Sequence, residues 1–218
     1  MSSAVIVSAV RTAVGTARKG TLANTGAEVM ALAVLKEVVA RSGVDPDQVD
    51  DVIFAESLYG GGAVARHAAV EAGMMRTAGM ALNRHCAGSL TSVGIGAALV
   101  LSGMERIIVA GGVMSSSTGP KMSRRVPGTD EIQDFWMPPT HPDSPDAPNL
   151  DMSITVGWNT AKEVGLTREE QDPWALRSHQ RAIAAIDAGH FEEEIVPVQA
   201  LMPDDSTALL DPFTDDPT

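Results

Sequence analysis

The only cysteine in the chain, Cys86, lies in the run NRHCAGSL (residues 83–90), between a strand-like segment and a helix of small residues. Backbone N–H groups at the start of a helix lack intrahelical partners and carry partial positive charge, which favours a thiolate over a thiol. A thiolate is a good acyl acceptor, so the setting indicates thioester chemistry. The alternative is that this cysteine is a small buried hydrophobic residue.

The residues around Cys86 belong to a pattern that continues along the chain. The lead-in Asn83-Arg84-x-Cys86 is followed by a short Gly/Ser step and an apolar helix. Further segments are VIVSAVRT (5–12), VDDVI (49–53), IIVAGG (107–112), LTREEQDPWALRSHQRA (166–182) and EEEIVPV (192–198). Together and in this order, these segments resemble the thiolases, enzymes that cleave or form 3-ketoacyl-CoA thioesters.

The resemblance implies an α/β fold of the layered thiolase type: a mixed five-stranded sheet with helices on both faces, plus an irregular loop domain. It assigns residues 1–125 to an N-terminal α/β domain that carries the nucleophile, and residues 126–218 to an incomplete loop domain. The second half of a complete thiolase carries a Gly-His-Pro histidine, a second cysteine and an Asn-Glu-x-Phe asparagine. The sequence contains none of these, so we expect the C-terminal catalytic domain to be missing.

The resemblance also implies the roles of individual residues. Cys86 would attack a carbonyl of an acyl-CoA and hold the acyl group until a second thiol or a carbanion collects it. Its own backbone N–H is the expected oxyanion donor. Met152, in a run that resembles the lining of the pantetheine channel, is an expected substrate contact, as are Arg177 and Ser178. CoA and acyl-CoA are expected as substrates, with no covalently bound cofactor, and the scattered histidines predict no metal.

Three functions remain open from the sequence. The leading one is a thiolase-type acyltransferase of lipid metabolism, converting 3-ketoacyl-CoA and CoA reversibly into acyl-CoA and acetyl-CoA. The alternative is a non-catalytic thiolase-like subunit or scaffold that needs a partner chain. The missing half favours this non-catalytic alternative. So does the segment that begins at Met152, which keeps Met152 and Thr155 of the family pattern but lacks its Gly, Ala and Glu. A ketoacyl-synthase condensation is third, and the Asn83-Arg84 lead-in argues against it.

Composition limits the partners. The net charge of −12 argues against sequence-independent nucleic-acid binding, which depends on Lys and Arg, and requires basic residues to gather locally around an anionic CoA. The longest apolar stretch, residues 93–101, is too short to span a bilayer, and no signal-peptide pattern opens the chain. We expect a cytoplasmic protein, inactive as these 218 residues alone, that joins a C-terminal thiolase half in a homodimer or tetramer.

Strand and helix signals alternate over the first part of the chain, which is typical of an α/β layer fold. Buried strands are predicted from short apolar runs at residues 4–10, 52–55, 80–82 and 107–110. A helix over residues 27–38 is expected to end at Gly43, and a second, over residues 63–72, at Gly73. The helix after Cys86 is apolar nearly all round, which predicts burial between two layers.

The downstream part of the chain begins with a proline-rich stretch, residues 129–151, which cannot form a regular helix or a central strand. Beyond it, Thr167 and Glu170 form a capping-box pattern that opens a helix ending near Gly189. Pro173 predicts a restart within that helix, with Asp172 as the new cap.

Overall fold

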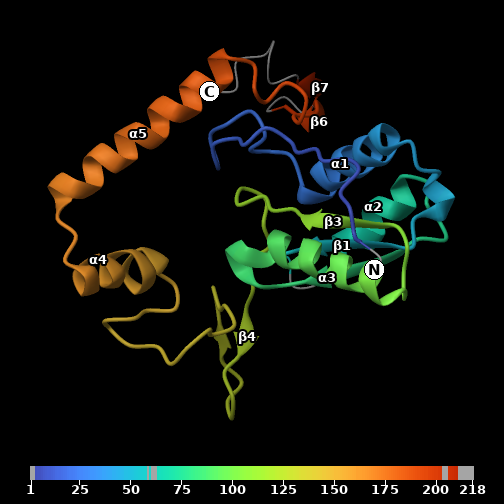
Figure 1. Cartoon of the computed structure of the whole chain (residues 1–218). Helices are drawn as coiled ribbons and strands as arrows, with labels where there is room; N and C mark the ends of the chain where they lie inside the picture. The colour runs from blue at the N-terminus through green and yellow to red at the C-terminus, as the bar shows by residue number, and fades with distance from the viewer. Residues whose placement is uncertain (1–2, 58, 60–62, 203–205, 211–218) are drawn as a thin grey trace. The chain divides into compact units, whose positions relative to one another are not determined.

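The structure is a computed structural model that describes residues 3–57, 59, 63–202 and 206–210 (Figure 1). The chain divides into two compact units: Met1–Pro120 with Glu192–Thr218, and Lys121–Phe191. The expected domain division at residue 125 rests on the family resemblance and stays a prediction.

A parallel three-stranded sheet of order β2-β1-β3 forms the centre of the first unit. The strands are β1 (Asp51–Ala55), β2 (Ala78–Leu82) and β3 (Ile108–Gly112). In register, Ala55 lies opposite Leu82 on one side and Gly112 on the other. Every residue of β1 is buried, as is usual for the middle of a parallel sheet whose two faces are covered by helices.

Helices cover both faces of this sheet, as the sequence predicts (Figure 1). On one face, α1 (Ala27–Ser42) and α2 (Val64–Glu71) share a core with Val52 and Phe54 of β1. On the other face, α3 (Gly88–Ser102) packs on β1 and β3. The alternation of side chains along β1 places Val52 and Phe54 on the face opposite Ala55, which α3 contacts through Gly88.

The predicted ends of α1 and α2 are confirmed. Gly43 caps α1 in the left-handed conformation with φ 69°, and Gly73 follows α2 with φ 82°. Glycine takes positive φ without steric cost, so the chain can turn sharply after each helix. A 3-10 turn, η1 (Pro46–Gln48), then leads from α1 into β1.

The predicted mixed five-stranded sheet is not seen in the described residues, whose largest sheet has three strands, all parallel. The predicted buried strand at residues 4–10 is also wrong, because this segment is extended without a ladder and exposes Val5 by 75% and Ile6 by 78%. An apolar run becomes a strand only where another backbone supplies hydrogen bonds. Among the described residues, the N-terminal segment has such a partner at Arg11, which forms an isolated parallel bridge with Ile195.

The predicted burial of α3 between two layers is wrong as well. Its buried residues are Gly88, Ser92 and Gly96, while Leu90 is 78% exposed. One side of the helix contacts the sheet and the other has no facing layer among the described residues. His85–Ser102 is the one described segment long and apolar enough to cross a membrane, a test that core helices of soluble proteins also pass.

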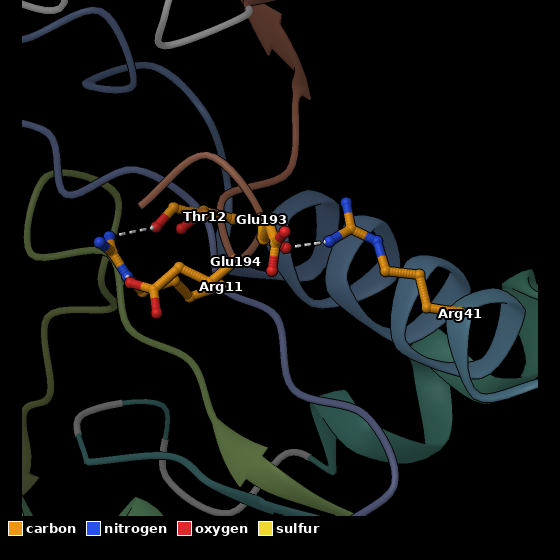
Figure 2. Close-up of polar contacts among 5 residues, drawn as sticks. All are labelled: Arg11, Thr12, Arg41, Glu193 and Glu194. Carbon is orange, nitrogen blue, oxygen red and sulfur yellow. Dashed lines mark hydrogen bonds and ion pairs between the residues drawn. The ribbon is translucent and has the colours of Figure 1, made fainter. Parts of the chain in front are cut away.

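Residues 192–201 return to the first unit and pair with the N-terminal segment. The Arg11 N–H donates to the Glu194 carbonyl at 2.8 Å, and the Val196 N–H donates to the Arg11 carbonyl at 2.9 Å. Figure 2 shows the Arg11 guanidinium beside Glu194, with an Nε–Oε1 distance of 2.7 Å, and Arg41 of α1 donating to the Glu193 carbonyl. The pairing thus includes both backbone and charged side chains.

The returning chain then forms an antiparallel pair, β6 (Val198–Leu201) with β7 (Thr207–Leu210). Val198 and Ala200 of β6 are buried, and β6 packs against α1. The Leu201 N–H donates to the Thr25 hydroxyl at 3.2 Å. The segment after the second unit is therefore part of the core of the first.

The second unit holds a short antiparallel pair, β4 (Arg124–Arg125) with β5 (Ile132–Gln133), and three helical segments. These are a π-helix, η3 (Ser153–Trp158), followed directly by α4 (Asn159–Val164), and then α5 (Arg168–Asp187).

The capping box that opens α5 is confirmed. The Thr167 hydroxyl accepts from the Glu170 N–H, and the Glu170 carboxylate accepts from the Thr167 N–H at 2.9 Å. The predicted restart at Pro173 is wrong, because α5 runs through this proline without a break and ends at Asp187.

Three carboxyl groups lie near the amino-terminal edge of the parallel sheet. Hydrogen bonds from the backbone N–H groups of Arg106 and Ile107, at 2.7 and 3.0 Å from Oδ2, lower the pKa of Asp50. Burial raises the pKa of Asp51. Burial, together with the charges of Asp51 and Asp50, raises the pKa of Glu105. Asp51 Oδ1 has no hydrogen-bond partner among the described residues.

Asp51→Asn and Asp50→Asn are expected to change stability in opposite directions. Folding raises the pKa of Asp51, so the ionised carboxylate destabilises the fold once the pH rises through the folded pKa. Asparagine carries no charge, so Asp51→Asn should be more stable than wild type near pH 7. That gain should vanish below the ordinary pKa of 3.8. Asp50→Asn should be less stable than wild type near pH 7, with the loss shrinking in acid as the pH falls through the lowered pKa of Asp50.

Urea denaturation from about pH 3 to about pH 7 measures both effects of these substitutions. The same sign for the two variants near neutral pH would contradict the assignment.

The contact between α3 and β1 predicts a large effect of one methyl group. A Cβ at Gly88 would lie 2.5 Å from the Cβ of Ala55, so Gly88→Ala is expected to lower the free energy of unfolding by about 1–3 kcal/mol. Gly94 of the same helix has open space around it, so Gly94→Ala should raise stability by about 0.5–1 kcal/mol. Chemical denaturation compares the two, and a loss in both would contradict the contact.

Candidate active site

The structure places Cys86 between a strand and a helix, as the sequence indicated. Leu82 ends β2, a single 3-10 turn, η2 (His85–Ala87), follows, and α3 begins at Gly88. Cys86 is exposed. We call residues 83–87 the Cys86 turn. The alternative, that Cys86 is a small buried hydrophobic residue, is therefore not what the structure shows.

Side-chain hydrogen bonds hold the Cys86 turn in an unusual backbone conformation. His85 has φ 47°, a left-handed conformation that is uncommon for residues other than glycine. Its N–H donates to Asn83 Oδ1 at 2.8 Å, and its carbonyl accepts from the Ser57 hydroxyl at 3.1 Å. Asn83 Nδ2 in turn donates to the Ser57 carbonyl at 3.1 Å. Both peptide groups of His85 are thereby fixed.

The backbone N–H of Cys86 makes no hydrogen bond within the part of the chain that the structure describes. Its neighbours are paired: the Ala87 N–H donates to the Arg84 carbonyl at 3.1 Å, and the Gly88 N–H donates to the His85 carbonyl. An unpaired N–H at the start of a helix can donate to a developing oxyanion. The geometry therefore offers a thiol and an oxyanion donor on one residue.

Close packing locks the start of α3 onto the carboxyl ends of the strands. Ser92 is fully buried, and its hydroxyl lies 2.6 Å from the Ser89 carbonyl and 2.7 Å from the Gly111 carbonyl of β3. Gly88 meets Ala55 of β1 with no room for a side chain. The carboxyl ends of parallel strands are where open α/β sheets commonly bind ligands. Cys86 is therefore anchored at a favourable edge of the sheet.

The predicted substrate contacts all lie in the second unit, whereas Cys86 belongs to the first. Met152 directly precedes η3 and is 53% exposed. Arg177 lies in α5 with its guanidinium 4.1 Å from the centre of the Trp174 ring, and Ser178 is its exposed neighbour. The structure places Arg177 and Ser178 on one helix and Met152 on another element. Their roles as substrate contacts stay predictions.

A carboxylate adjoins Met152. A hydrogen bond from the Ser153 hydroxyl lowers the pKa of Asp151, reinforced by the Ser153 and Ile154 N–H groups. The charge next to Met152 is therefore negative, and an anionic CoA would need compensating cations near it.

Sequence reasoning missed the contribution of Ser57. Its hydroxyl bonds His85 across 28 positions of the chain. Nothing in the local pattern around Ser57 indicates a link to Cys86, because the contact depends on the parallel pairing of β1 with β2. Asn83 belonged to the recognised lead-in, but its two hydrogen bonds were not predicted.

The family model described as "Thiolase, N-terminal domain" matches residues 4–213. The chain belongs to the thiolase family. Among relatives of this thiolase chain, an acetyl-CoA acetyltransferase of Pseudomonas aeruginosa is 38% identical over 214 residues, covering 91% of this chain and 52% of its own length. The family prediction from the residues around Cys86 is confirmed.

Solved thiolase structures agree with the fold. The acetyl-CoA acetyltransferase of Bacillus anthracis superposes with a TM-score of 0.78 at 30% identity, covering 94% of this chain and 52% of that one. The Acat5 thiolase of Ascaris suum, solved in complex with coenzyme A, gives 0.74 at 27% identity, covering 88% and 51%. The predicted α/β class is confirmed. This thiolase chain spans about half the length of the relatives it matches.

The exposure of Cys86 predicts its behaviour toward a small alkylating reagent. Because it is the only cysteine, iodoacetamide should add one carbamidomethyl group to the native chain, at a rate within about threefold of that in denaturant. Intact-mass spectrometry follows the reaction, with Cys86→Ala as the unreactive control. Modification that requires denaturant would contradict the exposed placement of the thiol.

Proposed function

We propose that this chain is the nucleophile-bearing part of a thiolase-type acyltransferase, which converts 3-ketoacyl-CoA and CoA reversibly into acyl-CoA and acetyl-CoA. The observation that carries the proposal is the exposed Cys86 thiol at the start of α3, with its own backbone N–H unpaired among the described residues. Membership of the thiolase family supports the class of reaction.

The proposed reaction has two steps. The Cys86 thiolate attacks the 3-keto carbonyl, and the oxygen gathers negative charge that the Cys86 N–H stabilises. The bond between C2 and C3 then breaks with its electron pair on C2, which takes up a proton and leaves as acetyl-CoA. The acyl group stays on the cysteine as a thioester. A CoA thiolate next attacks this thioester, releases acyl-CoA and restores the Cys86 thiolate.

The proton transfers need groups beyond those around Cys86. No hydrogen bond to the Cys86 thiol is found among the described side chains. We therefore propose that a C-terminal thiolase half, in the same or another polypeptide, supplies the acid and base, within a homodimer or tetramer. The exposed apolar side chains of the first unit, such as Val5, Ile6 and Leu90, support a partner surface there.

For the CoA-binding role we propose Met152, Arg177 and Ser178. The Arg177 guanidinium lies 4.1 Å from the centre of the Trp174 ring, and its N–H groups suit a phosphate. Exposure of Met152 leaves its thioether free to line a channel for the apolar part of CoA. The coenzyme A complex of the Ascaris suum thiolase supports the ligand class.

A second candidate function is a non-catalytic thiolase-like subunit. It is favoured by the absence of a general base bonded to Cys86 among the described side chains. The two candidates differ in one respect that can be measured: only the enzyme needs Cys86 to accept an acyl group.

With the C-terminal half of a relative added to supply the acid and base, incubation with acetoacetyl-CoA is expected to place one acetyl group on the chain, detected by intact-mass spectrometry, because the exposed thiol can attack the ketone. Added CoA should remove the acetyl group, because in the second step CoA attacks the Cys86 thioester. Cys86→Ala should form no adduct. An adduct on that variant would contradict the assigned nucleophile, and no adduct on wild type would favour the non-catalytic subunit.

A further inference from the structure

We propose that Ser57 and Asn83 are positioning residues for Cys86, and that they hold the turn in the conformation that aligns the thiol with the Cys86 N–H. We call their three hydrogen bonds, from Asn83 to Ser57, from Ser57 to His85 and from His85 to Asn83, the Ser57–Asn83 brace. The inference rests on the proposed function, since positioning matters only if Cys86 accepts an acyl group.

The backbone of His85 needs such a brace. At φ 47° its side chain crowds the adjoining peptide groups, and a non-glycine residue stays there only when its surroundings hold it. The brace binds both backbone polar groups of His85: Asn83 Oδ1 accepts a hydrogen bond from its N–H, and Ser57 Oγ donates one to its carbonyl. Relaxation to negative φ would rotate the following peptide group, whose N–H belongs to Cys86.

Ser57 is a rigid support because the residue before it, Glu56, is hydrogen-bonded to two other elements. Glu56 is 1% exposed, and its N–H donates to the Leu82 carbonyl at 3.0 Å, joining β1 to β2 directly before the turn. The Glu56 carboxylate accepts from the Val64 N–H at the start of α2. Ser57 therefore starts from a fixed point of the sheet, and its hydroxyl transmits that position to the Cys86 turn.

Acylation and alkylation of Cys86 depend on the turn to different degrees. Attack on a carbonyl requires the thiolate and the oxyanion donor to be aligned, and a displacement of about 1 Å can cost orders of magnitude in rate. Alkylation by iodoacetamide has no oxyanion and needs only an accessible thiol. The ratio of the two rates thus reports positioning, whereas a general loss of folding or exposure changes both.

The test uses the full chain with the C-terminal half of a relative added, and compares Ser57→Ala and Asn83→Ala with two conservative variants that retain part of the brace. Ser57→Thr keeps the hydroxyl, and Asn83→Asp keeps the acceptor for the His85 N–H. Ser102→Ala is the matched control, because it removes a similar hydroxyl-to-carbonyl bond, to Leu99, from the far end of α3. Acetyl-adduct formation from acetoacetyl-CoA, alkylation by iodoacetamide and hydrogen–deuterium exchange at the His85 amide are measured for each.

Both alanine variants are expected to slow acetylation about tenfold while alkylation changes less than about twofold. Ser57→Thr should recover most of the acetylation rate, and Ser102→Ala should match wild type. Exchange at the His85 amide should quicken in Asn83→Ala and Ser57→Ala and stay protected in Asn83→Asp. Equal losses of acetylation and alkylation, or unchanged exchange in both alanine variants, would overturn the proposal.

The same data separate this inference from the proposed function. If wild type forms no adduct while exchange at His85 responds to both alanine variants, the proposed function fails and the Ser57–Asn83 brace is upheld. If wild type is acetylated and neither variant alters its rate, the proposed function stands and the positioning role is overturned.

Discussion

The central strand β1 is the constraint on which the first unit depends. It is hydrogen-bonded to β2 on one edge and β3 on the other, and every one of its residues is buried. A strand in this position tolerates no change of register, because a shift by one residue would exchange its two faces. The helices α1 and α2 pack against one face of this strand, and α3 packs against the other.

The candidate site follows from where β1 ends. The start of α3 contacts Ala55 so closely that position 88 has no room for a side chain. The two residues after Ala55, Glu56 and Ser57, form hydrogen bonds to β2, to α2 and to the Cys86 turn. Small residues at the contact let helix and strand approach, and the hydroxyl at position 57 reaches the turn because of that approach. The reactive residue is thus exposed at the end of a rigid sheet.

An exposed apolar surface accompanies this arrangement. The helix α3 uses its small residues on the sheet and leaves larger ones such as Leu90 and Leu101 uncovered, and the extended N-terminal segment leaves Val5 and Ile6 uncovered. Large apolar side chains left exposed in this number are typical of an interface. The chain spans about half the length of its thiolase relatives, which agrees with the proposal that a second half covers this surface and completes the chemistry.

Features set by neighbouring residues could be predicted from the sequence: the glycine end of α1, the capping box of α5 and the turn that leads from Cys86 into α3. Each depends on hydrogen bonds a few positions apart. The tertiary structure alone decided that residues 4–10 form no strand and that α3 has one covered face, because a ladder and a buried surface both need a partner that is remote in the chain. The bond from Ser57 to His85 is of the same kind: its two residues meet only because β1 and β2 pair in parallel.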